Sequence, residues 1–190
     1  MIFGAVALLL CYGYAKTQRG AYESAPYTVL AKDKQFEIRD YPEMNIVATQ
    51  GFQTRDKQGN NAFRRLFKYI TGQNEKKQKI AMTTPVYMQG EDEQRTMAFV
   101  MPSKMRDVPL PTNEDVKVTK IEAGRFATFR FNGSRTDALE RQAVQKLKDW
   151  LSYRKDVSYD PEQTPVFGYF DPPFTPGYFR RNEVMLRLNQ

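Results

Sequence analysis

The order of hydrophobic patterns along this chain constrains its fold most, because the same order occurs twice. Alternating apolar and polar residues predict strands, and apolar residues three and four apart predict a helix. Each half reads strand, strand, helix, strand, strand, and the proline-punctuated segment 102–111 separates the halves. The predicted strands are 27–30, 36–41, 80–88 and 96–101 in the first half and 116–121, 126–131, 166–170 and 183–188 in the second, and an apolar stretch occupies 44–52.

One amphipathic helix is predicted in each half. The first runs from Asn61 to Ile70, and Gly72 supplies its C-terminal stop. Its apolar face is formed by Phe63, Leu66, Phe67 and Ile70, whereas Arg64, Arg65 and Lys68 lie off that face. The second helix opens at Ser134 and ends near Leu151. Its predicted buried side consists of Ala138, Leu139, Val144, Leu147, Trp150 and Leu151.

Two such halves can pair their sheets into one curved structure with a helix on each half. We therefore expect an α+β fold, a distorted antiparallel β-barrel with two helices packed on it. Residues 21–190 are about the size of one ordinary domain. Hydrophobic residues make up 41% of the chain, which is enough for a single core.

The first 20 residues are predicted to be a targeting segment. An apolar run from Ile2 to Leu10 precedes small residues at Gly13 and Ala15, as in a secretory signal peptide. The run is shorter than the roughly 20 apolar residues of a membrane span. Export to the periplasm, or a membrane anchor at the N-terminus, is therefore favoured over a full span. The alternative is an N-terminal strand or helix packed on the domain.

Histidine is absent, and the only cysteine, Cys11, lies in the predicted leader. This composition excludes Ser-His and Cys-His catalysis, the usual zinc sites, a disulfide within one chain and haem ligated by histidine. The formal charge of +7 favours anions as partners. The basic residues are scattered along the chain, so a nucleic-acid partner is not expected.

Four segments in this order resemble the SOUL haem-binding family, and the resemblance covers Tyr27 to Leu188. They are FEIRDYP (36–42), AFRRLFKYITG (62–72) with Asn74, KIAMTTPV (79–86) and DPPFTPGYFRRNEV (171–184). The resemblance implies a barrel of antiparallel strands with two helices, similar to the effector-binding domains of bacterial multidrug regulators. It also implies binding of haem or another tetrapyrrole in a cleft between the first helix and the loop 171–181.

The residues of those two segments suit such a ligand. A porphyrin is a flat apolar disc with two propionates, so it needs aromatic faces for the ring and cations at one edge. The candidate binding residues are Phe63, Arg64, Phe67, Lys68, Phe174, Tyr178, Phe179, Arg180 and Arg181. We predict weak binding through ring and edge contacts, with no metal site and no iron ligand from histidine. An axial ligand could come only from Met or Tyr.

Each candidate also has a structural interpretation. Phe63 and Phe67 belong to the apolar helix stripe and can be core residues. Arg180 and Arg181 can form an ion-pair network with Glu183 instead of meeting propionates. Arg64 and Lys68 can be a solvated helix face. Met82, Met88, Met97, Met101 and Met105 are expected to fill gaps in the core.

Three functions compete. The first is non-catalytic binding of haem or a related tetrapyrrole, as a buffer or carrier. The second is a general module that binds small amphipathic molecules, as effector-binding domains do. The third, an enzyme, is least favoured, because no carboxylate pair has the spacing of acid-base catalysis and no glycine-rich phosphate loop is present.

Overall fold

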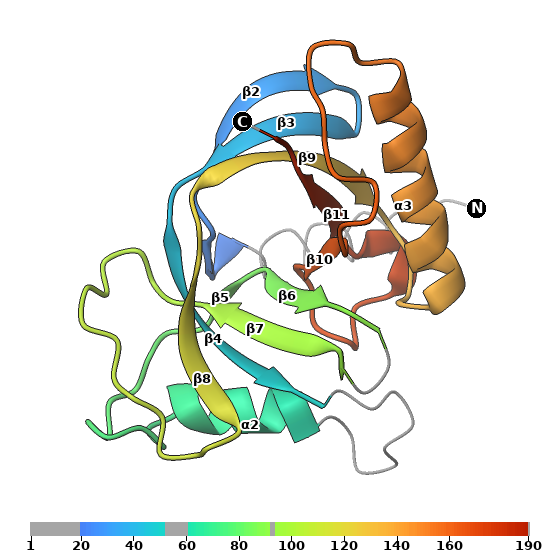
Figure 1. Ribbon diagram of the computed structural model, residues 1–190. Helices are drawn as coiled ribbons and strands as arrows, with labels where there is room; N and C mark the ends of the chain where they lie inside the picture. The colour runs from blue at the N-terminus through green and yellow to red at the C-terminus, as the bar shows by residue number, and fades with distance from the viewer. Residues whose placement is uncertain (1–19, 52–60, 92–93, 190) are drawn as a thin grey trace.

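Nine strands form one sheet that curls into a half-barrel, and two α-helices lie against it (Figure 1). The computed structural model describes residues 20–51, 61–91 and 94–189. The strands of the sheet are β2 (Thr28–Asp33), β3 (Phe36–Tyr41), β4 (Met44–Gln50), β6 (Val86–Gln89), β7 (Thr96–Val100), β8 (Val116–Ile121), β9 (Gly124–Phe131), β10 (Val166–Tyr169) and β11 (Asn182–Arg187). The helices are α2 (Asn61–Ile70) and α3 (Asp137–Ser152). The predicted α+β fold, a distorted antiparallel barrel with two helices, is confirmed.

The strand order across the sheet is β2-β3-β9-β11-β10-β6-β7-β4-β8, and all neighbours are antiparallel. From β3 to β8 this order is symmetric. Exchanging β3 with β8, β9 with β4, β11 with β7 and β10 with β6 gives the same strand order read backwards. The two halves therefore exchange strands, since β3 pairs with β9 of the second half and β8 pairs with β4 of the first.

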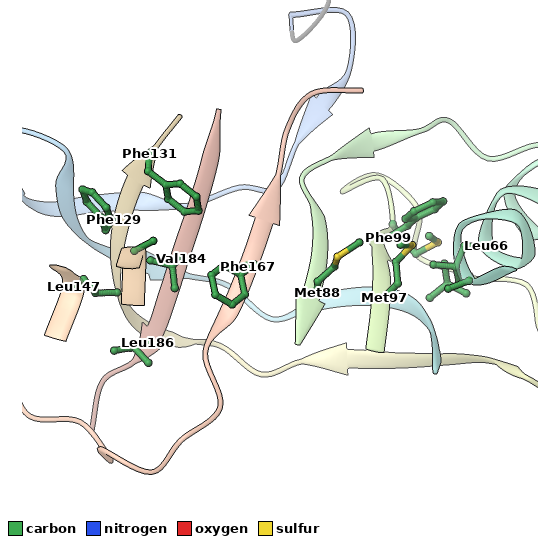
Figure 2. Packing of buried hydrophobic residues seen from close by; sticks show 14 of the residues in the cluster. Leu66, Met88, Met97, Phe99, Phe129, Phe131, Leu147, Phe167, Val184 and Leu186 are labelled. Atoms are coloured by element: carbon green, nitrogen blue, oxygen red, sulfur yellow. The ribbon is translucent and has the colours of Figure 1, made fainter. Parts of the chain in front are cut away.

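Both helices lie on one face of the sheet. α2 packs on β4 and β7, and α3 packs on β9 and β11. A continuous apolar cluster joins them, from Leu66 on α2 across Met88 and Phe167 on the central strands to Leu147 on α3 (Figure 2). Leu66 and Leu147 are fully buried, so each helix is held mainly by hydrophobic burial of one stripe.

The opposite, concave face of the sheet carries a second apolar cluster that includes Tyr41, Tyr87, Phe126 and Met185. A parallel pair of two-residue strands, β1 (Glu23–Ser24) and β5 (Thr83–Thr84), lies outside the main sheet. The segment that follows β1 supplies Ala25 to this cluster, and Tyr27 packs against it.

Two expectations about element boundaries need correction. The predicted strand 80–88 is two strands, β5 and β6, separated by Pro85, and residues 80–82 belong to neither. α3 begins at Asp137 rather than near Ser134, because Thr136 caps it and accepts a hydrogen bond from the Leu139 amide at 3.2 Å.

The predicted burial of Ala138 was wrong, since this residue is exposed. The buried stripe of α3 consists of Glu140, Ala143, Leu147 and Leu151. Glu140 is tolerated there because Arg95 and Arg135 form ion pairs with its carboxylate at 3.2 and 2.9 Å.

The predicted leader falls on residues 1–19, which lie outside the described residues, and on Gly20. Targeting and anchoring by this segment stay predictions. Within the described ranges, neither helix has the length and apolar character needed to cross a bilayer.

Candidate functional site

The candidate aromatic residues of α2 lie at the edge of the core. Phe63 is half-buried and contacts Phe99 of β7 edge-on, with ring centroids 5.4 Å apart. Phe67 stacks on Phe63 at 5.8 Å and leaves 47% of its surface exposed. Arg64 and Lys68 are both exposed, and no ion-pair partner is found for either among the described residues. This face of α2 therefore presents apolar surface beside two uncompensated cations.

The candidate aromatic residues of the loop 171–181 are more exposed still. Phe174 and Tyr178 leave 76% and 64% of their surfaces open. Phe179 is half-buried and packs against Tyr178 at 4.5 Å. The loop contains a single helical turn, η2 (Gly177–Phe179), so these aromatic side chains stand on an ordered segment.

Gly177 fixes the loop against the turn between β9 and α3. Its carbonyl accepts a hydrogen bond from the Gly133 amide at 2.9 Å. A Cβ at this position would lie 2.7 Å from the hydroxyl oxygen of Ser134, so only glycine permits this close approach. Asn132 adds side-chain hydrogen bonds to the carbonyls of Tyr178 and Arg180 at 3.1 and 2.8 Å.

Adjacent strand residues connect the two segments. Phe63 touches Phe99, Phe99 is paired with Val86 of β6, and Val86 is paired with Tyr169, which ends β10 shortly before the loop. Two strand spacings of about 4.8 Å each, roughly 10 Å together, separate the Phe63 contact from Tyr169.

Arg180 and Arg181, adjacent in sequence, have different partners. Arg180 donates from Nε to the Thr175 carbonyl at 2.6 Å and also donates to the carbonyl of Pro173, so it stiffens its own loop. Arg181 forms an ion pair with Glu183 at 2.6 Å and lies over the Phe170 ring at 4.0 Å. The structural interpretation of Arg181 and Glu183 as ion-pair partners is confirmed. Arg180 is not among the partners of Glu183.

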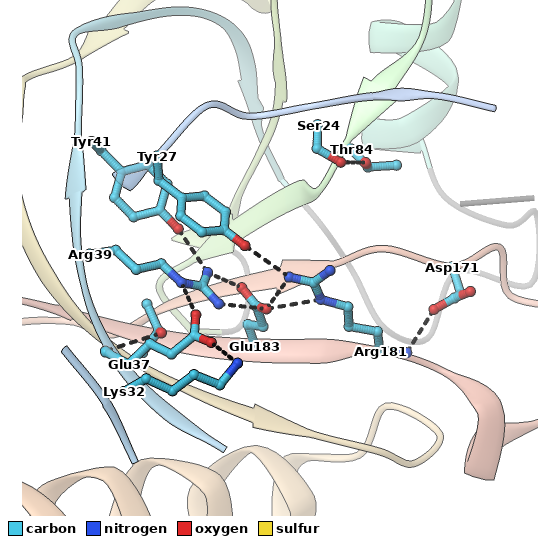
Figure 3. Close-up of polar contacts among 11 residues, drawn as sticks. Ser24, Tyr27, Lys32, Glu37, Arg39, Tyr41, Thr84, Asp171, Arg181 and Glu183 are labelled. Atoms are coloured by element: carbon cyan, nitrogen blue, oxygen red, sulfur yellow. Dashed lines mark hydrogen bonds and ion pairs between the residues drawn. The ribbon is translucent and has the colours of Figure 1, made fainter. Parts of the chain in front are cut away.

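The carboxylate of Glu183 is the centre of a buried network on the concave face (Figure 3). Arg39 of β3 binds it through two nitrogens, at 2.7 and 3.1 Å, and Arg181 binds it from the other side. Arg39 also donates to the Tyr41 hydroxyl at 3.0 Å and lies over the Tyr27 ring at 4.1 Å. Hydrogen bonds from two guanidinium groups compensate the burial of the carboxylate.

The same contacts set the protonation state of the network. Burial alone would raise the pKa of the Glu183 carboxyl, but the hydrogen bonds and charge of Arg39, with those of Arg181, outweigh burial and lower it. Burial raises the pKa of the Tyr41 hydroxyl to about 12. The network is therefore a fixed arrangement of ionised carboxylate, guanidinium and neutral phenol at neutral pH.

A cavity of about 400 Å³ opens on the concave face, and none of the nine predicted binding residues lines it. Its walls come from most strands of the sheet and from the segment before β10. Its apolar lining includes Met44, Met88, Phe126, Val166 and Met185. Of the central strand β10, Val166 faces this cavity, whereas Tyr169 at the other end leads into the loop 171–181.

The five methionines that the sequence analysis expected in the core lie in it or against it. Met88, Met97 and Met101 are buried in the core, while Met82 and Met105 pack half-buried against it, as the sequence predicted. Across the described residues, no group of three or more Asp, Glu, His or Cys side chains is arranged to hold a metal ion.

The curled antiparallel sheet with one helix on each half defines the class of α+β half-barrel domains. The model of the SOUL heme-binding protein family matches residues 22–187, and the chain belongs to this family. It is 32% identical to heme-binding protein 1 of Xenopus tropicalis over 163 residues, which are 81% of this chain and 84% of that protein. The corresponding identity to heme-binding protein 1 of Xenopus laevis is 30%, with the same coverage.

Solved structures share the fold at low sequence identity. A hydrolase from Listeria innocua superposes with a TM-score of 0.61 at 12% identity, covering 84% of this chain and 94% of that one. The C-terminal domain of EcmrR superposes with a TM-score of 0.55 at 15% identity, covering 82% and 98%. At these identities the likeness concerns the fold alone.

Sequence analysis missed Arg39 and the cavity. A signal for Arg39 was present, because Glu37, Arg39 and Tyr41 stand two apart along β3 and so share one face of the sheet. The cavity had no comparable signal, since its lining comes from strands that are distant in sequence and meet only through the strand exchange.

Proposed function

We propose that this protein binds haem or a related tetrapyrrole without catalysis, on the surface formed by α2 and the loop 171–181. The observation that carries the proposal is the exposure of Phe67, Phe174 and Tyr178, which the fold holds on ordered segments instead of burying. Exposed aromatic faces gain free energy when a flat apolar ring covers them. Membership of the SOUL heme-binding protein family supports this ligand class.

Different residues would contact the macrocycle of the ligand and the propionates at its edge. Phe63, Phe67, Phe174, Tyr178 and Phe179 would contact the macrocycle. Arg64, Lys68 and Arg180 would meet the propionates, because each is free of a carboxylate partner among the described residues. Arg181 would contribute indirectly, since its guanidinium is already bound to Glu183. No iron ligand from the protein is part of the proposal.

A titration with hemin tests the proposal. We expect a saturable Soret shift with one site, and we expect Phe174→Ala combined with Tyr178→Ala to weaken binding at least about tenfold. Tyr153→Ala is the matched control, because Tyr153 is 86% exposed on the C-terminal end of α3 and lies outside the proposed surface. A shift that never saturates, or equal losses in both variants, would exclude this site.

Charge variants test the propionate contacts. Arg64→Glu with Lys68→Glu should weaken hemin binding, and the loss should shrink at high salt. Lys117→Glu with Lys120→Glu makes the same change of net charge on the exposed edge strand β8. If the β8 variant weakens binding equally, hemin responds only to net charge and the assigned contacts are wrong.

The second candidate function is binding of small amphipathic molecules in general. The cavity on the concave face favours it, because a volume of about 400 Å³ with a largely apolar lining lies within the usual range of small-molecule sites. The export predicted from the leader would place either activity in the periplasm or at the membrane surface.

A further inference from the structure

We infer that the concave cavity is a second ligand site, separate from the proposed haem surface, for an amphipathic carboxylate with a polar group at its far end. The inference does not rest on haem binding. It rests on three features of the cavity, namely its apolar walls, its charge and one hydroxyl that has no hydrogen-bond partner among the described residues. Each feature points to a different part of the ligand.

The walls define an apolar body. Methionine and aromatic side chains from both halves of the sheet line the space, including Met44, Met185 and Phe126. Methionine side chains adapt their shape to a ligand and contact rings and aliphatic chains equally well. The ligand therefore has a hydrophobic middle part that the cavity removes from water.

The charges of the lining define the head group. The lining includes two cations, Lys120 and Arg187, and no Asp or Glu. Lys120 is half exposed and pairs with Glu43 at 2.6 Å. Arg187 has no carboxylate partner among the described residues. Its guanidinium donates instead to the carbonyl oxygens of Glu122 and Ala123 and lies 5.0 Å from the centre of the Phe126 ring.

Arg187 is therefore a positioned and uncompensated positive charge in the cavity wall. Carbonyl oxygens orient a guanidinium but do not neutralise its charge, so a carboxylate can still bind it favourably. This complementarity selects an anionic head over a neutral or cationic one.

The hydroxyl of Tyr87 defines the far end. Tyr87 lines the cavity, is only 4% exposed and has no hydrogen-bond partner for its hydroxyl within the described part of the chain. Each fully buried side-chain nitrogen or oxygen there does have a partner, so the Tyr87 oxygen must reach accessible space. Burial raises the pKa of this hydroxyl, which keeps it a proton donor at neutral pH.

Tyr87 lies level with Glu183 of the buried network, because Gly168 of β10 pairs with both residues, whereas Arg187 stands four residues further along β11. A ligand whose carboxylate meets Arg187 can thus place a hydroxyl or keto oxygen against Tyr87. An unpaired buried donor discriminates strongly for a ligand that satisfies it.

Displacement of the fluorescent acid dansylamino-undecanoate from the full chain tests the inference. We expect saturable binding at one site, weakened at least about tenfold by Ile121→Trp, which puts a larger side chain into the cavity wall from β8. The control is Val29→Trp on the other edge strand, β2, where Val29 is 44% exposed and lines no part of the cavity. Absence of saturable binding, or equal affinity in both variants, would overturn the inference.

Three competitors of equal chain length test the Arg187 contact and the Tyr87 contact separately. Dodecanoate should displace the reporter about tenfold better than dodecanol, and Arg187→Gln should remove that preference. The ω-hydroxy derivative of dodecanoate should bind better than dodecanoate itself, and Tyr87→Phe should remove that second preference. If dodecanol competes as well as dodecanoate, the site does not select an anion. If the hydroxyl preference survives Tyr87→Phe, Tyr87 is not the contact.

The same variants distinguish this site from the haem surface. Ile121→Trp should leave the hemin titration unchanged, and Phe174→Ala with Tyr178→Ala should leave the displacement assay unchanged. Failure of hemin to bind would therefore not affect this inference. Loss of hemin binding in Ile121→Trp would overturn the separation of the two sites.

Discussion

At the scale of single residues, Glu183 is a buried carboxylate held by two arginines. The carboxylate is 1% exposed, and the guanidinium groups of Arg39 and Arg181 bind it from two sides. Removing one member of a buried ion pair leaves the others uncompensated, which typically costs about 3–5 kcal/mol. The exposed pair Lys120–Glu43 also joins a cation to a carboxylate, but without burial the solvent screens the attraction.

We predict that Glu183 contributes an acid-sensitive part of the stability. Its pKa is lower in the folded state than its ordinary value of about 4.3, so the unfolded state takes up a proton first as the pH falls. The contribution is therefore complete above about pH 5 and is lost as the pH falls through the folded-state value. The measurement is the free energy of unfolding in urea between pH 7 and pH 3.

Glu183→Gln should lower the free energy of unfolding at pH 7 and flatten its decline in acid. Glu37, Glu23 and Asp156, whose pKa values are also lowered, contribute to the slope that is left. An unchanged slope in Glu183→Gln would show that Glu183 is not ionised in the folded protein.

The sequence predicted part of this residue-scale chemistry. Arg180, Arg181 and Glu183 were recognised as possible partners because they lie together at the base of the closing strand, and of the two arginines only Arg181 pairs with Glu183. Arg39 could not be assigned to them, because it is 144 residues from Glu183 and reaches it only through the pairing of β3 and β11 with β9. Long-range partners of a charge follow from topology, which local patterns do not encode.

At the scale of elements, the loop 171–181 depends on a close approach of two backbones. We predict that Gly177→Ala destabilises the protein by about 1–3 kcal/mol, because the added Cβ would meet the Ser134 backbone nitrogen at 2.8 Å. The loop would have to move away from Gly133 and would carry Phe174 and Tyr178 with it. Urea denaturation measures the stability, and the hemin titration measures the displacement of the aromatic residues.

Gly20→Ala is the matched control, because no atom lies within 4 Å of a Cβ at that position. It should change the free energy of unfolding by less than about 0.5 kcal/mol. Equal stability of the two variants would mean that the loop accommodates the methyl group elsewhere.

The bounds of single elements could be predicted from the sequence, but the contact of the loop 171–181 could not. The helix 61–70 was predicted with its observed bounds, since its apolar residues recur at helical spacing and Gly72, at φ +116°, ends it. The loop was recognised as a separate segment by its prolines and aromatic residues. Its contact with the β9–α3 turn was not predicted, because a glycine in sequence does not reveal which backbone will approach it.

At the scale of the whole molecule, strand exchange joins the two halves. The sequence predicted the repeated order of elements, but a repeat is compatible with two separate units as well as with one sheet. The structure has β3 in the sheet of the second half and β8 in that of the first. Neither half can therefore complete its sheet without a strand from the other.

We predict from this exchange that the halves unfold together, and Trp150 allows the test. It is the only tryptophan, lies on α3 and stacks on Phe36 of β3 at 5.1 Å, so its fluorescence reports the second half of the sheet. Leu66→Ala, on α2 in the first half, should destabilise the protein by about 2–5 kcal/mol and shift the Trp150 transition as far as the circular-dichroism transition. Leu147→Ala on α3 should shift both equally too. If Leu66→Ala moves the circular-dichroism transition and leaves the Trp150 transition in place, the halves unfold separately and strand exchange does not couple them.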